Sequence, residues 1–238
     1  MIRYGNFLFR YRNTFFPLVL CALLLSFKPP EIGALLDTTL DILGVLVVLT
    51  GQAVRALVIG LDYIKRGGLH KKVYADELVT SGIFKHCRNP LYLGNLLIIA
   101  GLLIVHDNPW SYLFGVIFFV LSYMSIVKAE EKYLAEKFGA AYSDYCERTP
   151  RLLFRLHGLR QTLSGRNFNW SKVIFKDYST MMTWIISLCV LFSWDDISLH
   201  GIRSAAVTIA VSAGFVLLAV CSGVYIKTLK KAGVGRLA

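Results

Sequence analysis

The sequence predicts an all-α, polytopic transmembrane protein with about six membrane-spanning helices. Three features support this prediction: the composition, six long apolar runs and the one-sided placement of the basic residues. Of the 238 residues, 55% are hydrophobic and only 17% are charged, whereas about 25% of residues are charged in an average soluble domain. The high apolar content, the aperiodic glycines and the lack of a Cys-x-x-Cys pair exclude a disordered, a collagen-like and a disulfide-stapled chain.

Six apolar runs are candidates for helices that cross the membrane. About 20 consecutive apolar residues in a helix span the hydrocarbon layer. Four of the runs are long enough by themselves, whereas the first and the fifth need flanking residues, such as Phe7 to Phe9, to reach across. In chain order, the runs cover residues 13–27, 38–61, 90–106, 110–127, 180–194 and 204–226.

The basic residues lie almost entirely on one side of this arrangement. The net charge is +11, from 26 Lys and Arg residues and 15 Asp and Glu residues. If all six runs span the membrane, 23 of the 26 basic residues fall on one side, which the positive-inside rule assigns to the cytoplasm together with both termini. Membrane orientation and anionic lipid therefore explain the basic charge, and we expect no nucleic-acid partner. This side comprises segments 1–12, 62–89, 128–179 and 227–238.

The third and fourth runs are predicted to form a tight helical hairpin. Pro109 stands between them, in the short segment 106–110, and proline is favoured at the first position of a helix. Pro90 is likewise expected to be the first residue of the third run. A hairpin brings its two ends together, so the polar clusters at 78–94 and 130–151, which flank it, are predicted to meet at one cytoplasmic site.

The residue types in these clusters suit a zwitterionic ligand that also carries a cation. The free N–H groups at a helix start favour an anion such as a carboxylate. Glu130 and Glu131 could accept hydrogen bonds from an ammonium or a ribose, and a sulfonium is attracted to negative charge and to aromatic faces. Tyr142 and Tyr145, three residues apart, share one helical face. Taken alone, the two glutamates also fit a solvated helix end, and the two tyrosines fit an interfacial belt.

The two clusters resemble the paired motifs of the isoprenylcysteine carboxyl methyltransferase and phospholipid methyltransferase superfamily. They read LVTSGIFKHCRNPLYLG over residues 78–94 and EEKYLAEKFGAAYSDYCERTPR over residues 130–151. Gly51 and Arg55 in the second run also look like the Gly-x-x-x-Arg of that family. For Arg55, a side chain that merely snorkels to the interface is an equally good interpretation.

This resemblance implies S-adenosylmethionine as methyl donor, bound in a membrane-embedded helical site. The sequence has no strand followed by Gly-x-Gly-x-x-Gly and a helix, so no Rossmann sheet is expected. The residues implied in cofactor binding are Val79, Gly82, Arg88, Asn89, Tyr92, Glu130 and Tyr142. The residues implied near the reacting groups, and predicted to be catalytic, are Glu131, Arg148 and Arg151.

The match to the family pattern has three departures. Asn89 stands where many members have His, Phe84 where many have Tyr, and Phe154 where a second Pro often ends the block. Asn can still donate and accept hydrogen bonds, but Phe84 lacks the hydroxyl, which puts any hydrogen bond of that side chain in doubt. The residues beyond 154, with two predicted helices, have no counterpart in the pattern.

The resemblance implies an S-adenosylmethionine-dependent integral membrane methyltransferase that acts on a lipophilic acceptor at the cytoplasmic face. The acceptor would be an isoprenylcysteine-type carboxylate or another isoprenoid or lipid, and Arg148 or Arg151 would orient a carboxylate. The alternatives are a phosphatidylethanolamine-type N-methyltransferase, for which Glu131 is the predicted base, and a non-catalytic lipid-binding or scaffold relative. Sharing a scaffold does not identify the acceptor.

The chain is expected to divide into four segments. Residues 1–61 form N-terminal transmembrane helices, 62–154 the methyltransferase core with its hairpin, 155–180 a basic interfacial segment and 181–238 a C-terminal helix pair. Residues 151–163 mix basic and apolar side chains, as an interfacial helix does. We expect no metal or haem site, because no two of the five His are spaced to meet inside the bilayer.

Overall fold

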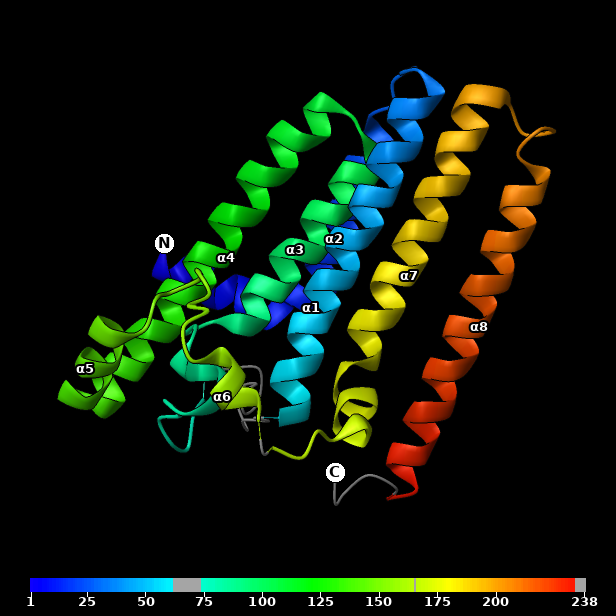
Figure 1. The fold of residues 1–238 in the computed structure, drawn as a ribbon. Helices are drawn as coiled ribbons and strands as arrows, with labels where there is room; N and C mark the ends of the chain where they lie inside the picture. Colours follow the sequence, from blue (N-terminus) through cyan, green and yellow to red (C-terminus); the bar gives the residue numbers. More distant parts are fainter. Residues whose placement is uncertain (62–73, 165, 234–238) are drawn as a thin grey trace.

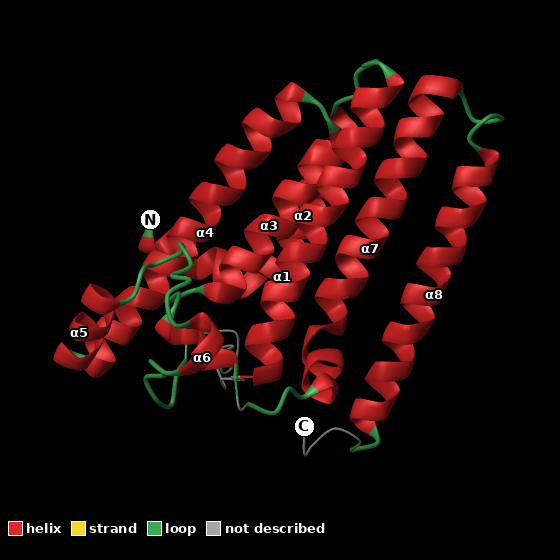
Figure 2. Cartoon of the chain, viewed as in Figure 1, coloured by secondary structure: helices red, strands yellow, loops and turns green. Residues whose placement is uncertain are grey.

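The computed structural model describes residues 1–61, 74–164 and 166–233, and all regular structure in these ranges is helical (Figures 1 and 2). The predicted all-α, polytopic fold class is thereby confirmed. The helices are α1 Ile2–Ser26, α2 Ala34–Leu61, the 3-10 helix η1 Gly82–Lys85, α3 Pro90–His106, α4 Pro109–Phe138, α5 Ala140–Arg148, α6 Leu159–Leu163, α7 Trp170–His200 and α8 Ala206–Lys231.

Among the described residues, five helices are long and apolar enough to cross a membrane: α1, α2, α4, α7 and α8. The first and fifth predicted runs do gain flanking residues, because α1 begins at Ile2 and α7 begins at Trp170. The third run differs from the expectation, since α3 has 17 residues, or about 26 Å at 1.5 Å per residue. This is shorter than the hydrocarbon layer of about 30 Å, so α3 reaches across only part of it.

The α3–α4 hairpin has the predicted geometry. Pro90 and Pro109 each occupy the first turn of their helix. Asp107 takes a left-handed conformation at φ 63°, and the Asn108 side chain caps α4 by accepting a hydrogen bond from the Trp110 N–H at 2.9 Å. The Asn108 amide also donates to the Lys28 carbonyl at 2.7 Å, which ties the hairpin loop to the segment between α1 and α2.

Glycines allow α2 and α3 to pack with their backbones in contact. A Cβ atom at Gly51 would lie 2.6 Å from the Gly94 carbonyl oxygen, and one at Gly101 would lie 2.5 Å from the Gly44 carbonyl oxygen. Small residues permit this close approach between membrane helices. The motif glycines Gly51 and Gly94 therefore fix the distance between the two helices that carry Arg55 and Tyr92.

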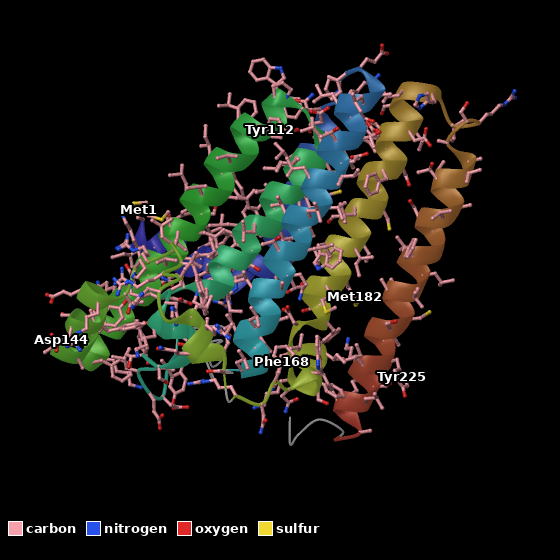
Figure 3. The ribbon with its side chains drawn as sticks, viewed as in Figure 1. Met1, Tyr112, Asp144, Phe168, Met182 and Tyr225 are labelled. Atoms are coloured by element: carbon pink, nitrogen blue, oxygen red, sulfur yellow. The ribbon has the colours of Figure 1, made fainter. Side chains whose placement is uncertain are left out.

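The helices α7 and α8 form the other side of the bundle, and α8 is its outermost helix (Figure 1). α7 packs against α2 and α3, whereas α8 packs mainly against α7. Met182 of α7 points toward α8 (Figure 3), where a Cβ at Gly223 would lie 2.0 Å from the Met182 sulfur. The early start of α7 makes the end of the predicted 155–180 segment continuous with the fifth run.

One end of the bundle carries η1, α5 and α6, and we call it the motif end (Figure 1). Residues 86–88 run beside residues 150–155: the Arg88 N–H donates to the Pro150 carbonyl at 2.9 Å, and the Arg155 N–H donates to the His86 carbonyl at 3.0 Å. The prediction of one interfacial helix over 151–163 is wrong, because only Leu159–Leu163 is helical. The preceding backbone hydrogen-bonds to the first motif cluster instead.

Candidate functional site

A cavity of about 490 Å³ lies among α1, α2, α3, α4 and α7. Its lining on α3 runs from Pro90 to Leu102, which is about 18 Å along the helix axis. The polar lining residues near the motif end include Arg12, Asn13, Arg88, Asn89, Tyr92 and Glu130. The deeper lining is mainly apolar and includes Phe16, Leu20, Ile98, Leu102 and Phe119. The cavity thus combines a polar end with an apolar interior.

The start of α3 brings the two motif clusters together, as the sequence predicts. Asn89 is the N-cap residue of α3, yet its side chain does not cap the helix. The Asn89 amide donates instead to the Arg151 carbonyl at 3.1 Å. Together with the Arg88–Pro150 backbone hydrogen bond, this contact fixes the second cluster against the N-terminus of α3.

Three side chains from three helices form a continuous hydrogen-bonded chain at the polar end. Arg12 of α1 donates to the Tyr92 hydroxyl at 2.9 Å. The Tyr92 hydroxyl donates in turn to the Glu130 carboxylate at 2.6 Å. All three residues line the cavity. Tyr92 and Glu130 were predicted from the motif clusters, whereas Arg12 in the sequence is only one of the basic residues that set membrane orientation.

Glu131 has different surroundings from its neighbour Glu130. The Arg151 guanidinium binds both Glu131 oxygens, with N–O distances of 3.0 and 2.6 Å, and Arg88 contacts the same carboxylate at 3.3 Å. The hydrogen bond to Glu131 raises the pKa of Arg151. Glu131 and Arg151 do not belong to the cavity lining, so this ion pair sits behind the wall that Arg88 forms.

Arg88 links the ion pair to the cavity. Its Nη2 contacts Glu131, while its buried Nε has no hydrogen-bond partner among the described residues. A buried donor without a partner costs free energy of about 1–3 kcal/mol. The Nε–H of Arg88 is therefore a natural contact for an anionic or acceptor group of a ligand.

Arg55 belongs to a buried polar network between α2, α3 and α7. Its guanidinium forms an ion pair with Asp177, whose side chain is fully buried, and donates to Asn95 at 2.6 Å. Gln52 donates to the other Asp177 oxygen at 2.9 Å and accepts from the Trp184 indole N–H at 2.9 Å. Arg55 therefore pairs inside the bundle and does not snorkel. Asp177 was not predicted as a partner, because it lies in the polar segment 128–179 of the sequence.

Besides Glu131 and Arg151, four more predicted site residues lie outside the cavity lining. Val79 packs against the cluster around Val58, and Gly82 begins η1 at φ 62°. Tyr142 is buried, and burial followed by the charge of Glu131 raises its pKa. Arg148 is exposed in the last turn of α5. The predicted roles of these residues in binding or catalysis remain predictions.

Two buried tyrosines attach α5 to the motif end. The Tyr145 hydroxyl donates to the Phe84 carbonyl at 2.7 Å, and its ring lies against Tyr142. Both side chains are only 5% exposed, so neither is an interfacial belt residue. The Phe84 ring is buried and lines the cavity, so this position contributes its main-chain oxygen and an apolar face.

His86 and Cys87 lie where residues 86–88 run beside residues 150–155. The His86 ring contacts the Arg155 carbonyl at 2.6 Å and the Thr162 hydroxyl at 2.8 Å, and it stacks on Phe154. Phe154, a departure from the family pattern, thus covers His86. Burial raises the pKa of Cys87 to about 11, so its thiol is neutral near pH 7 and is no nucleophile there.

The comparisons with known proteins give one family. Residues 40–141 match the model of the phospholipid methyltransferase family. The cobalt-zinc-cadmium resistance protein CzcN of Cupriavidus metallidurans is 30% identical over 138 residues, which cover 57% of this chain and 61% of that protein. The nickel-cobalt-cadmium resistance protein NccN of Alcaligenes xylosoxydans xylosoxydans is 33% identical over 82 residues, or 34% of this chain and 38% of that protein.

The family match covers the hairpin, most of α2 and about half of the second motif cluster. The chain spans about three-fifths of the length of CzcN and less of NccN. No solved structure matches the chain. In the described ranges, no group of three or more His, Cys, Asp or Glu side chains is placed to hold a metal ion. Through residues 40–141, which make up less than half of the chain, the protein is similar to the phospholipid methyltransferase family.

Proposed function

We propose that this protein is an S-adenosylmethionine-dependent methyltransferase that acts on a lipophilic acceptor at the motif end. The observation that carries the proposal is the cavity itself. Residues from the first motif cluster and Glu130 from the second line its polar end, and its apolar part continues among helices α1, α3 and α4. A site of this shape offers one compartment for a polar donor and another for an apolar chain.

The polar end has the groups that the donor requires. When bound, S-adenosylmethionine supplies a methyl group that its sulfonium activates for transfer. Glu130 is the one carboxylate among the lining residues that the structure describes, and with the Tyr92 ring it would stabilise the sulfonium charge. The buried Arg88 Nε–H would donate to the carboxylate of the donor, and Asn89 would contact its polar edge.

The apolar part of the cavity favours an acceptor with a hydrocarbon chain. Ile98 and Leu102 of α3 line it together with Phe16 and Leu20 of α1. Apolar burial contributes about 25 cal/mol for each Å² removed from water. A hydrocarbon chain bound in this part would place the head group of the acceptor beside Glu130 and Arg88. There the main contribution of the protein to the reaction is to position the nucleophile and the methyl group.

The charges around the cavity favour an anionic acceptor group. The lining carries four cationic side chains, Arg12, Arg55, Arg88 and Lys176, and the carboxylate of Glu130. Asp177 pairs with Arg55 and Glu131 pairs with Arg88 from behind the wall. The guanidinium groups of Arg12 and Arg88 at the polar end would attract a carboxylate acceptor and repel an ammonium acceptor. This difference supports an isoprenylcysteine-type carboxylate over a phosphatidylethanolamine-type amine.

The geometry also changes which residues we assign to the reaction. Arg88 lines the cavity and Arg148 does not, so we no longer assign a carboxylate to Arg148 and propose Arg88 as the arginine that binds the carboxylate of the donor. Arg151 and Glu131 would support Arg88 through their ion pair. For an amine acceptor, Glu130 replaces Glu131 as the proposed base, since Glu130 reaches the cavity and Glu131 is held by two arginines.

Two other functions are compatible with the same fold. The family description favours phospholipid N-methylation, and a non-catalytic lipid-binding relative would retain the cavity without turnover. The resistance to metal ions that names CzcN and NccN does not distinguish these possibilities. We further propose that the motif end and both termini face the cytoplasm, because most basic residues lie at that end.

Radiolabelled methyl transfer tests the proposal. Purified protein in lipid nanodiscs receives methyl-labelled S-adenosylmethionine and a total lipid extract, and the label in the lipid fraction is treated with base. Base releases the labelled methyl group from a methyl ester, which a carboxylate acceptor would give, but not from an N-methyl group, which an amine acceptor would give. Glu130→Gln should abolish transfer, while Glu136→Gln, an exposed change on the same helix, should leave it intact. Absence of both transfer and donor binding in the native protein would refute the methyltransferase proposal.

A further inference from the structure

We infer that Arg12 of α1 is a positioning residue that orients the Tyr92 hydroxyl and the Glu130 carboxylate for the methyl donor. Arg12 lies outside the family segment 40–141. The inference rests on the proposed function, because the donor is the ligand that these two groups would contact. It extends the site beyond the two motif clusters to the N-terminal helix.

The contacts define the direction of the hydrogen-bonded chain. A guanidinium has only donors, so the Tyr92 oxygen must accept from Arg12 at 2.9 Å. The tyrosine proton then points to Glu130, whose carboxylate oxygen lies 2.6 Å away. Without Arg12, the tyrosine oxygen loses its donor, and the hydroxyl keeps only its hydrogen bond to Glu130. The position of the Glu130 carboxylate is then no longer fixed from the α1 side.

Arg12 itself is held in place by aromatic rings. Its guanidinium carbon lies 4.2 Å from the centroid of the Phe9 ring and 5.7 Å from that of the Tyr92 ring. Cation–π contacts of this kind are strongest where water is excluded, and the Tyr92 side chain is 9% exposed. The side chain of Arg12 is therefore fixed on the cavity side of α1.

The backbone of α1 is docked closely enough to support such a role. A Cβ at Gly5 would lie 2.1 Å from the Ser125 carbonyl oxygen of α4. About one turn further along α1, the Leu8 side chain is fully buried, and beyond it the Phe16 ring packs edge-on against Tyr123 at 5.2 Å. α1 thus forms a fixed wall of the cavity, and Arg12 reaches Tyr92 from a rigid position.

Arg10 provides a matched control on the same helix. It is exposed, two residues before Arg12, and its guanidinium lies against the Tyr11 ring. Arg10 does not line the cavity. A change at Arg10 removes the same charge from α1 without touching Tyr92, so it separates a general effect of charge from the specific contact.

The test measures S-adenosylmethionine affinity and the kinetic constants of the full-length protein in nanodiscs. Arg12→Gln should weaken donor binding by about tenfold or more, the range for a lost charge-assisted hydrogen bond, and should raise KM for the donor more than it lowers kcat. Arg12→Lys should recover part of the affinity, and Arg10→Gln should match the native protein. Tyr92→Phe should resemble Arg12→Gln, and the double variant should be no worse than Tyr92→Phe alone, because both changes break one chain.

The outcomes separate this inference from the proposed function. A native protein that does not bind S-adenosylmethionine overturns the proposed function and the inference with it. A native protein that binds the donor, with unchanged affinity in Arg12→Gln or fully additive effects in the double variant, overturns only the inference. If Arg12→Gln fails to fold, donor affinity is measured in Arg12→Lys and Tyr92→Phe instead. Full affinity in both variants overturns the inference, whereas weakened binding in both supports it.

Discussion

Replacing Asp177 by alanine is expected to lower the free energy of unfolding by about 3–5 kcal/mol, the cost of removing one partner of a buried ion pair. The side chain of Asp177 is fully buried, and that of Arg55 is 11% exposed. Asp177 also accepts from Gln52 at 2.9 Å. The alanine variant therefore leaves the buried Arg55 guanidinium without its counter-charge and the Gln52 amide without its acceptor. Among the described residues, Asp177 is the only acidic partner of Arg55.

Two further variants test whether the charge is the cause. Asp177→Asn keeps the shape and an acceptor for Arg55, so it should cost less than the alanine change. Arg55→Met combined with Asp177→Leu removes both charges and should recover most of the stability, because apolar pairs replace buried ion pairs at little cost. Asp144→Ala, at an exposed position of α5 (Figure 3), is the matched control.

The assay is unfolding of the purified protein in mixed detergent, followed by helical circular dichroism. An Asp177→Ala variant within about 0.5 kcal/mol of the native protein would refute the proposal that this ion pair joins α7 to α2. A double variant as unstable as Asp177→Ala would show that the loss comes from packing and not from an uncompensated charge.

Three other predictions concern helix packing, thiol reactivity and membrane topology. Gly51→Ala should destabilise the protein by about 1–3 kcal/mol, because its Cβ would lie 2.6 Å from the Gly94 carbonyl oxygen, whereas Gly214→Ala, with no atom within 4 Å, should be neutral in the same unfolding assay. Cys87 should resist alkylation at pH 8, because its pKa is raised to about 11. The shift favours the protonated thiol, so the contribution of this thiol to stability is present below its ordinary pKa near 9 and is lost as pH rises from about 9 to about 11. Rapid labelling in the folded protein, read by mass spectrometry, would contradict this. In a cysteine-free background, Ser143→Cys should be shielded from an impermeant maleimide in intact cells and Ser204→Cys should react; the reverse pattern would invert the proposed topology.

Local sequence signals were sufficient for the hairpin and for the meeting of the two motif clusters. Pro90 and Pro109 mark helix starts because their missing N–H groups have no partner there in any case. A two-residue connection then forces α3 and α4 to run antiparallel. This brings the residues before α3 close to those after α4 without any knowledge of the other helices.

The contacts from α1 and α7 could not be predicted in the same way. Arg12 meets Tyr92 across 80 residues, and Arg55 meets Asp177 across 122 residues. Apolar periodicity shows which residues are helical but not which faces of distant helices meet. Lys176 and Asp177 also interrupt the apolar pattern, so the sequence analysis started the fifth run at residue 180, ten residues after α7 begins.

The segment 151–155 shows a local preference overridden by tertiary contacts. Its mixture of basic and apolar residues is typical of an interfacial helix. In the fold, however, its carbonyls accept from the Asn89 amide and contact the His86 ring, and the Arg155 N–H donates to His86. Backbone groups used in this way are not available for a helix. Composition alone carries no signal for such pairing.

We propose that the methyl donor binds where α1, α3 and α4 meet at the motif end. Ultraviolet cross-linking of tritiated S-adenosylmethionine to the native protein in nanodiscs, followed by peptide mapping, locates the donor. We expect label on peptides that contain Tyr92, Arg12 or Phe84, and loss of this label when S-adenosylhomocysteine competes. Label confined to α8, or label on any peptide that resists competition, would contradict the claim.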